Sequence, residues 1–322
     1  MNLTRITLSI LISMLIVFTA CQEDEPAPDP NLLNYAAGKN SYSIQISGSD
    51  RNFHVHVPAS YDGNSAVPLV FMFHGSGGNG NNTYSNSGWK EVAENEGFIA
   101  VFPTAMVYFV EALQREQTKW SSIGLDTELA PGTKIQDDIP FVQNMLAKLR
   151  TTFKIDESRV YASGFSNGGG FSKSRLMCEL SDVFAAIGTA GGHGLNSYVP
   201  VTSPDLLPLH TIMGNEDDKK LNLAGQTSPF PMDGPSIMRH PYLREKMDHI
   251  FNMLEVDTTY TAVEEAPNFN TLTFSEDLSG QGNEFRFRMV KGMGHVWPDG
   301  SNHPSGLKAA ELFWDFFKQH SK

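Results

Sequence analysis

The chain has 322 residues, enough for one large domain or two small ones, and its 40% hydrophobic and 19% charged residues are typical of a globular protein. Its 36 acidic residues outnumber its 24 basic residues, which gives a formal net charge of −12. This balance argues against nucleic acid as a partner, because phosphate binding requires a basic face.

The first 20 residues predict a signal peptide of the lipoprotein type. Arg5 supplies a positive charge, and the apolar run 6–20 is shorter than a typical membrane-spanning helix. Residues 18–21 resemble the lipobox at which bacterial lipoproteins are cleaved and lipidated, with Phe18 in place of the usual Leu, Val or Ile. We therefore expect cleavage after Ala20 and a lipid on Cys21. The alternative is an ordinary signal peptide that is cut near Ala20.

Residues 21–41 are expected to be the lipidated cysteine and a disordered tether. The stretch 22–30 is acidic and rich in proline, a composition that favours an extended chain. Acidic residues directly after a lipidated cysteine also resemble the signal that sends some Gram-negative lipoproteins to the outer face of the outer membrane. The expected location is the outer membrane or cell surface, reached only through the lipid, with the periplasm or secretion as the alternative.

The chain has two cysteines, Cys21 and Cys178. If a lipid occupies Cys21, no intramolecular disulfide can form. Cys178 is then expected to be a small buried hydrophobic residue. A domain of this size does not need a disulfide, because its core is large enough without one.

Residues 42–322 are expected to form a single domain, and its sequence predicts several strands. Residues 53–57 predict an edge strand before Pro58. Continuous apolar runs, typical of strands buried on both faces, occur at 69–73, 98–102, 159–162, 184–188, 207–213 and 285–290.

Helices alternate with these strands. Apolar residues at helical spacing predict helices at 89–95, 138–150, 243–254 and 307–317. Alternation of this kind predicts an α/β fold with a mostly parallel sheet that is covered by helices on both faces. Two stretches, 105–136 and 219–238, fit no element, and we expect substrate-facing loops there.

Residues 164–168, Gly-Phe-Ser-Asn-Gly, match the G-x-S-x-G pattern of a nucleophile elbow. The motif follows the predicted strand 159–162 and precedes a glycine run that leads into a helical stretch. Its glycines permit a tight turn, which would present Ser166 near the start of the next helix. Ser166 is therefore the candidate nucleophile, and the alternative is a glycine-rich loop with an incidental serine.

A serine nucleophile needs a base, and the base needs an acid that orients it. Among ten histidines, His295 lies in a short loop just after the last predicted strand, which makes it the candidate base. Asp217 follows the run 207–213 and is the candidate acid, with Asp218 as the alternative. The chain order Ser166, Asp217, His295 is that of α/β-hydrolase triads.

Residues 74–78, His-Gly-Ser-Gly-Gly, follow the predicted strand 69–73. A glycine-rich turn there can direct backbone N–H groups at an oxyanion. The candidate donors are the N–H groups of Ser76 and Asn167. His74 is expected to support the loop by hydrogen bonding and not to transfer protons.

A family resemblance rests on several of these strings. Residues 68–103, 160–170 and 294–298, with Asp137 and Asp138 before a helix, resemble an esterase and depolymerase group. This group contains polyhydroxybutyrate depolymerase-like proteins and bacterial feruloyl and acetylxylan esterases. The resemblance covers most of the chain after residue 50.

The resemblance implies an α/β-hydrolase fold, an acyl-enzyme mechanism and no metal or other cofactor. By motif position it assigns Ser166, Asp217 and His295 as the triad. The chain departs from the group at residues 218–221, Asp-Lys-Lys-Leu, where a Val-Pro-Tyr-like turn is usual. It also lacks the cysteine pairs of several secreted relatives.

Together these features predict an exported serine esterase whose substrates are feruloyl or acetyl esters on polysaccharide. Trp120 and Trp297 are candidates for lining a flat apolar slot that suits an aromatic acyl group, with core packing as the alternative for both. Three other functions stay open: a polyester depolymerase, a serine peptidase on the same fold, and a non-catalytic glycan-binding surface lipoprotein.

Overall fold

The computed structural model describes residues 32–192, 205, 207–265 and 268–322. The predicted signal peptide, Cys21 and most of the predicted tether therefore lie outside the described residues. Within the described ranges, no helix has the length and apolar character that crossing a membrane requires.

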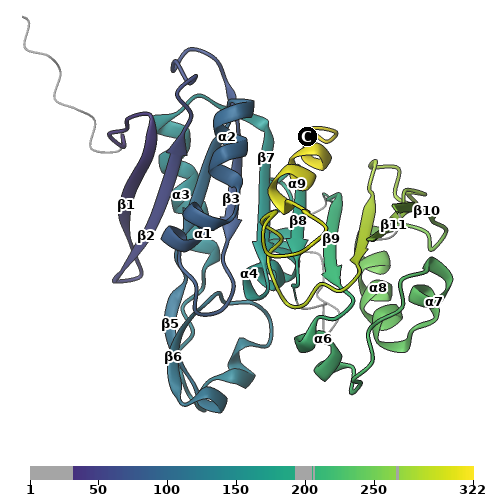
Figure 1. The fold of residues 1–322 in the computed structure, drawn as a ribbon. Coiled ribbons are helices and arrows are strands. Elements are labelled where there is room, and N and C mark those ends of the chain that lie inside the picture. The colour runs from purple at the N-terminus through teal and green to yellow at the C-terminus, as the bar shows by residue number, and fades with distance from the viewer. Residues whose placement is uncertain (1–31, 193–204, 206, 266–267) are drawn as a thin grey trace, which may run out of the picture. The chain divides into compact units, whose positions relative to one another are not determined.

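The described residues form one ten-stranded sheet, which Figure 1 shows across the width of the molecule. From one edge to the other, its strands are β1 (Gly38–Ile46), β2 (Ser49–Val57), β4 (Ile99–Pro103), β3 (Val67–Phe73), β7 (Ile155–Phe165), β8 (Ala186–Ala190), β9 (Leu209–Gly214), β12 (Phe285–Val290), β11 (Phe269–Phe274) and β10 (Thr261–Glu265). The strands from β4 to β12 run parallel, and antiparallel pairs complete both edges. The predicted mostly parallel sheet is confirmed.

The first two strands differ from the sequence-based expectation. The prediction of an edge strand at 53–57 is wrong, because β2 pairs with β1 on one side and with β4 on the other. The edge strand is β1, which begins at Gly38, inside the stretch expected to be a tether. Burial alternates along β1, but residues 38–41 are not apolar, so the apolar alternation that identifies a strand begins only at Tyr42.

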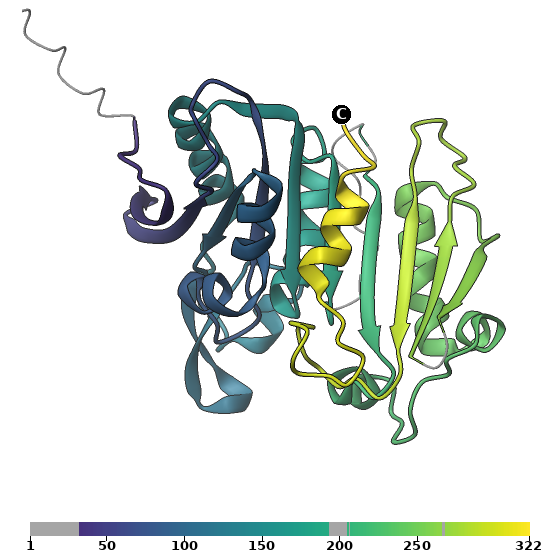
Figure 2. The ribbon, with the colours of Figure 1, turned by 45° about the horizontal axis from the view of Figure 1, so that its top comes forward.

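Helices cover both faces of this sheet, and Figure 2 shows the yellow helix α9 crossing one of them. One face is covered by α3 (Ile139–Thr152), α4 (Asn167–Phe171), the π-helical turn Ser172–Leu176, α5 (Met177–Glu179) and α8 (Pro241–Leu254). The other face is covered by α2 (Trp89–Glu96) and α9 (Ala309–Phe317). The shorter helices are α1 (Gly80–Asn86), α6 (Asp218–Leu223) and α7 (Gly234–Arg239).

Strand β3 shows why the buried runs are continuous and not alternating. Leu69, Phe71 and Phe73 pack into the core beneath α3 and α8, whereas Val70 and Met72 pack into the core beneath α2 and α9. Because successive side chains point to opposite faces, a strand with helices on both sides must be apolar at every position.

The two unassigned stretches contain elements that the sequence pattern does not reveal. Residues 105–136 form a hairpin of β5 (Met106–Val110) and β6 (Arg115–Lys119), with 3₁₀ turns at Glu111–Leu113 and Leu125–Glu128. Strand β6 reads Arg-Glu-Gln-Thr-Lys and has no apolar alternation, so it pairs through its backbone with a partner that supplies the buried side chains. Residues 219–238 hold most of α6 and almost all of α7.

Candidate active site

The serine of the G-x-S-x-G motif lies on a sharp turn between β7 and α4. Ser166 has a φ of +50°, a left-handed conformation that a residue with a Cβ rarely adopts. The glycines on both sides make the turn sterically accessible. A Cβ on Gly164 would lie 2.5 Å from the carbonyl oxygen of Gly168, and a Cβ on Gly168 would lie 2.3 Å from that of Phe73. The predicted strand–turn–helix arrangement is therefore present.

Hydrogen bonds join the three candidate triad residues in sequence. His295 Nε2 lies 2.9 Å from Ser166 Oγ, and His295 Nδ1 lies 2.8 Å from Asp217 Oδ2. Because a carboxylate only accepts, Nδ1 carries the proton and Nε2 offers its lone pair to the serine hydroxyl. Asp217 is buried, whereas Asp218 is exposed. The structure thus brings Asp217, not Asp218, to the histidine.

The loops after β9 and β12, which carry the acid and the histidine, hold each other in place. Asn215 Oδ1 accepts the N–H of Gly292 at 2.6 Å, and the N–H of Glu216 donates to the Met293 carbonyl at 3.0 Å. A Cβ on Gly214 would lie 1.9 Å from that carbonyl oxygen, so only glycine fits. Sequence reasoning missed Asn215, although it lies two residues before the candidate acid.

The loop 74–78 lies against the elbow. A Cβ on Gly75 would be 3.2 Å from the Cβ of Ser166, so the backbone of this loop approaches Ser166 closely. Neither the N–H of Ser76 nor that of Asn167 donates to another described residue. These two N–H groups remain available to a ligand.

His74 fixes this loop. Its Nε2 accepts the N–H of Ala105 at 3.0 Å, so its Nδ1 carries the proton and donates to the Gly75 carbonyl at 2.7 Å. Burial lowers the pKa of His74 to about 4, so the ring is neutral near pH 7. The supporting role expected for His74 is confirmed.

The side chain of Asn167 ties the elbow to the stretch 120–122. Its Oδ1 accepts the N–H of Trp120 at 2.7 Å, and its Nδ2 donates to Ser122 Oγ at 2.9 Å. The expectation that Trp120 lines a substrate slot is wrong, because its side chain is fully buried between Phe73 and Phe171. Trp120 is a packing residue beneath the loop 74–78, and its indole N–H donates to the carbonyl of His74 in that loop.

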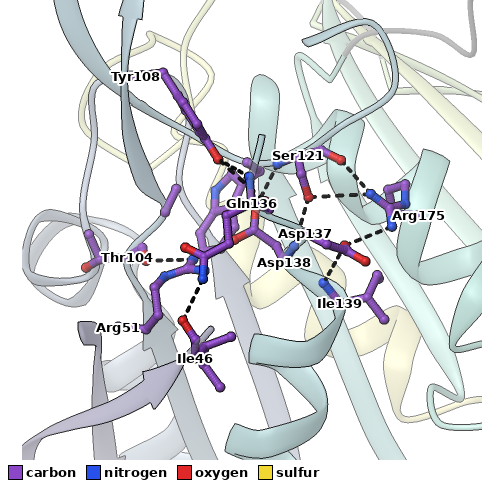
Figure 3. A network of polar contacts seen from close by, with 12 residues as sticks. Ile46, Arg51, Thr104, Tyr108, Ser121, Gln136, Asp137, Asp138, Ile139 and Arg175 are labelled. Atoms are coloured by element: carbon purple, nitrogen blue, oxygen red, sulfur yellow. Dashed lines mark hydrogen bonds and ion pairs between the residues drawn. The ribbon is translucent and has the colours of Figure 1, made fainter. Parts of the chain in front are cut away.

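Figure 3 shows a second anchor of the same stretch, the buried ion pair between Arg51 and Asp138. Arg51 Nη2 lies 2.5 Å from Asp138 Oδ1, and Asp138 Oδ2 accepts the N–H of Ser121 at 2.7 Å. Ser121 Oγ in turn accepts the N–H of Asp138 at 3.0 Å, and Arg175 Nη1 donates to the Ser121 carbonyl. Burial raises the pKa of Asp138, and the Arg51 guanidinium opposes that rise.

A pocket of about 380 Å³ opens beside His295. Its apolar wall is made by Met72, Phe165 and Trp297. The indole N–H of Trp297 donates to the Ser87 carbonyl, which fixes the ring in this wall. Polar residues complete the lining, among them Asn82, Thr83, Asn86, Asp299 and Asn302.

Comparisons with known proteins agree with this architecture. A bifunctional acetylxylan esterase/xylanase from Neocallimastix patriciarum is 29% identical over 179 residues, which cover 56% of this chain and 23% of that protein. Feruloyl esterase B from Piromyces equi is 30% identical over 132 residues, covering 41% and 22%. A poly(3-hydroxyalkanoate) depolymerase C from Paucimonas lemoignei is 29% identical over 150 residues, covering 46% and 33%. The chain therefore spans a third or less of these relatives' lengths. No protein-family model matches it.

Solved structures show the same fold. An acetyl xylan esterase from Aspergillus awamori aligns with a TM-score of 0.54 at 14% identity, covering 87% of this chain and 99% of that one. LpqC, a poly(3-hydroxybutyrate) depolymerase from Bordetella parapertussis, aligns with a TM-score of 0.52 at 18% identity, covering 87% and 91%. The α/β-hydrolase fold and the similarity to the esterase and depolymerase group, both expected from the motifs, are confirmed.

Proposed function

We propose that this chain, which is similar to feruloyl and acetylxylan esterases and to a polyester depolymerase, is a serine hydrolase of carboxylic esters. One observation carries the proposal: hydrogen bonds run without a break from Asp217 through His295 to Ser166. Ser166 is also held in a strained backbone conformation, and such strain clusters at active sites.

In the proposed reaction, Ser166 Oγ attacks the ester carbonyl carbon while His295 Nε2 takes the hydroxyl proton. The buried carboxylate of Asp217 stabilises the imidazolium that forms. His295 then gives this proton to the leaving alcohol, and the carbon–oxygen bond breaks to leave an acyl group on Ser166. A water molecule, deprotonated by His295, attacks the acyl-enzyme and releases the acid.

The N–H groups of Ser76 and Asn167 are the proposed donors to the tetrahedral oxyanion. Both lack an acceptor among the described residues, and the loop that carries Ser76 lies against the nucleophile. Fixed donors of this kind act at full strength because they need no reorganisation in the transition state. Removing one of them typically costs about 2.7–4 kcal/mol of transition-state stabilisation.

The proposed substrates are feruloyl or acetyl esters on polysaccharide. The pocket beside His295 has an apolar wall that suits an acyl group and a polar rim that suits sugar hydroxyls. Trp297 supports an aromatic acyl group, because its ring forms part of that wall. Because Trp120 lies in the core, one wall of the expected aromatic slot is missing. This favours an acetyl ester over a feruloyl ester as the substrate.

A hydrolysis panel tests the substrate class. The protein is assayed with methyl ferulate, acetylated xylan, 3-hydroxybutyrate oligomers and a chromogenic peptide, and Ser166→Ala serves as the blank. We expect cleavage of the acetyl or feruloyl esters above the other substrates. Faster cleavage of the hydroxybutyrate oligomers would move the assignment to a depolymerase. Cleavage of no ester by the folded protein would leave the non-catalytic glycan-binding alternative.

A pair of neighbouring variants tests the acid. Asp217→Asn should reduce kcat on the order of 10⁴-fold, because an amide stabilises the wrong histidine tautomer. Asp218→Asn is the matched control, since Asp218 is adjacent and exposed. Equal losses in both variants would contradict the assigned roles.

The proposed location is the cell surface, through a lipid on Cys21. Support comes from the lipobox-like residues 18–21 in the sequence. In a Gram-negative host, Cys21→Ser should release the protein from the membrane fraction or block its processing. Normal cleavage with unchanged membrane retention would contradict the lipid anchor.

A further inference from the structure

Two lysines are buried at a second cavity. Lys173 belongs to the π-helical turn after the elbow helix, and Lys220 belongs to α6. Each has only 2% of its surface exposed. Both line a small cavity whose other described lining residues are mostly apolar or aromatic, among them Met213, Ile250 and Phe285, with Lys246 as a third lysine.

The positive charge at this cavity has no matching negative charge among the described residues of its lining. None of these residues is Asp or Glu. Lys220 Nζ is buried without a hydrogen-bond partner, and Lys173 Nζ makes no hydrogen bond to another described residue. Lys246 differs, because it pairs with Glu245 at 2.7 Å.

Asp217 does not satisfy these lysines. It is the carboxylate whose charge acts on Lys220. Its Oδ2 bonds to His295, and its Oδ1 accepts the backbone N–H of Lys220, not the Nζ. A buried ammonium without a partner is strongly unfavourable. The arrangement therefore calls for a negative ligand.

The charge state of the two amines agrees with this need. Burial lowers the pKa of Lys220 to about 8, and burial with the Lys220 charge lowers the pKa of Lys173 to about 7. An anion placed against both amines would oppose both causes and favour their protonated forms.

The cavity is separate from the pocket beside His295, since the two have no lining residue in common. Its volume is about 40 Å³. This small volume suits a monatomic ion better than a sugar or a cinnamic acid. We propose that Lys173 and Lys220 form a buried binding site for a monatomic monovalent anion, which is chloride under ordinary ionic conditions.

Thermal unfolding in two salts tests the site. The Tm is measured at pH 7 in sodium chloride and in sodium gluconate of equal ionic strength, because gluconate is too large for the cavity. At a chloride concentration ten times the dissociation constant, the Tm should rise by about 3 °C relative to gluconate. This readout does not depend on ester hydrolysis, so it stays valid whatever the catalytic activity is.

Two variants of one helix make the comparison specific. Lys220→Met should lose the chloride-dependent rise in Tm, because a thioether does not bind the anion. Lys219→Met is the matched control and should keep it, since Lys219 is adjacent and exposed. An equal response in both variants, or no difference between the salts for the parent protein, would overturn the proposal.

Bromide provides a direct view if Lys220→Met does not fold. Crystals of the parent protein soaked in sodium bromide should show an anomalous peak in the cavity, within hydrogen-bonding distance of both Nζ atoms. Electron density for water alone at this position, with no anomalous signal, would overturn the proposal.

Discussion

Two clusters of buried charge meet at the π-helical turn Ser172–Leu176 and differ in how their charge is balanced. On one side, Arg175 of this turn supports the stretch that is held by the Arg51–Asp138 ion pair. On the other side, Lys173 of the same turn and Lys220 both line a cavity, and none of the described residues in its lining is a carboxylate. A paired buried charge fixes local geometry, whereas an unpaired one indicates a missing ligand.

The largest effect is expected from breaking the paired cluster. Asp138→Ala leaves Arg51 buried without its partner and should lower the free energy of unfolding by about 3–5 kcal/mol. Urea unfolding measures this loss. Asp137→Ala is the matched control: Asp137 pairs with Arg175 at a half-exposed position, so its loss should stay below about 1 kcal/mol. Equal losses would remove the distinction between the two neighbours.

Removing a charge from the unpaired cluster, Lys173 and Lys220, should raise the free energy of unfolding and not lower it. In chloride-free buffer at pH 7, Lys220→Met should raise the free energy of unfolding by about 1 kcal/mol or more, because it removes an uncompensated buried charge. The same urea experiment measures the gain. A loss comparable to that of Asp138→Ala would show that Lys220 already has a partner, and the contrast between the clusters would fail.

The stability of the protein should depend on pH through the two buried lysines. Between pH 7 and 10 the unfolded chain binds more protons at Lys173 and Lys220 than the folded chain, because folding lowers both pKa values. The free energy of unfolding should therefore rise with pH in this window when chloride is absent. Relative to the parent, Lys173→Met should show a shallower rise, and chloride should flatten the rise of the parent. Parallel profiles with and without chloride would contradict the proposed coupling.

The smallest effect is expected at the contact between Ser122, in the stretch held by the Arg51–Asp138 ion pair, and Asn167 of the candidate active site. Ser122→Ala removes the hydrogen bond from Asn167 Nδ2, which is worth about 1 kcal/mol, or roughly a fivefold loss in kcat. KM should be nearly unchanged if Asn167 contributes only in the transition state. An unaltered kcat would show that the side-chain anchor is not needed to position the backbone N–H.

The buried strands and the three candidate triad positions were predictable from the sequence because each has a local signal. Apolar runs mark the central strands, and the G-x-S-x-G pattern with a following glycine marks the turn at Ser166. His295 was recognisable because it lies in the loop just after β12, the last strand. Burial distinguishes Asp217 from Asp218 in the structure. The sequence does not show which of two adjacent aspartates is buried.

The features that sequence analysis missed depend on contacts between distant residues. Arg51 and Asp138 are 87 positions apart, and nothing local indicates that either is buried. Lys173 and Lys220 lie in helical stretches, where lysine ordinarily faces solvent. The prediction that Trp120 lines a substrate slot was wrong because no residue pattern around it distinguishes core packing from a binding surface.

Covalent labelling shows whether Ser166 is the nucleophile that His295 activates. The protein is incubated with a fluorophosphonate, and the modified peptide is identified by mass spectrometry alongside a chromogenic-ester assay. We predict a single adduct on Ser166 with complete loss of ester hydrolysis, and strongly slowed labelling in His295→Ala because the hydroxyl has lost its base. An adduct on another serine, or ester hydrolysis that persists after Ser166 is fully labelled, would contradict the account.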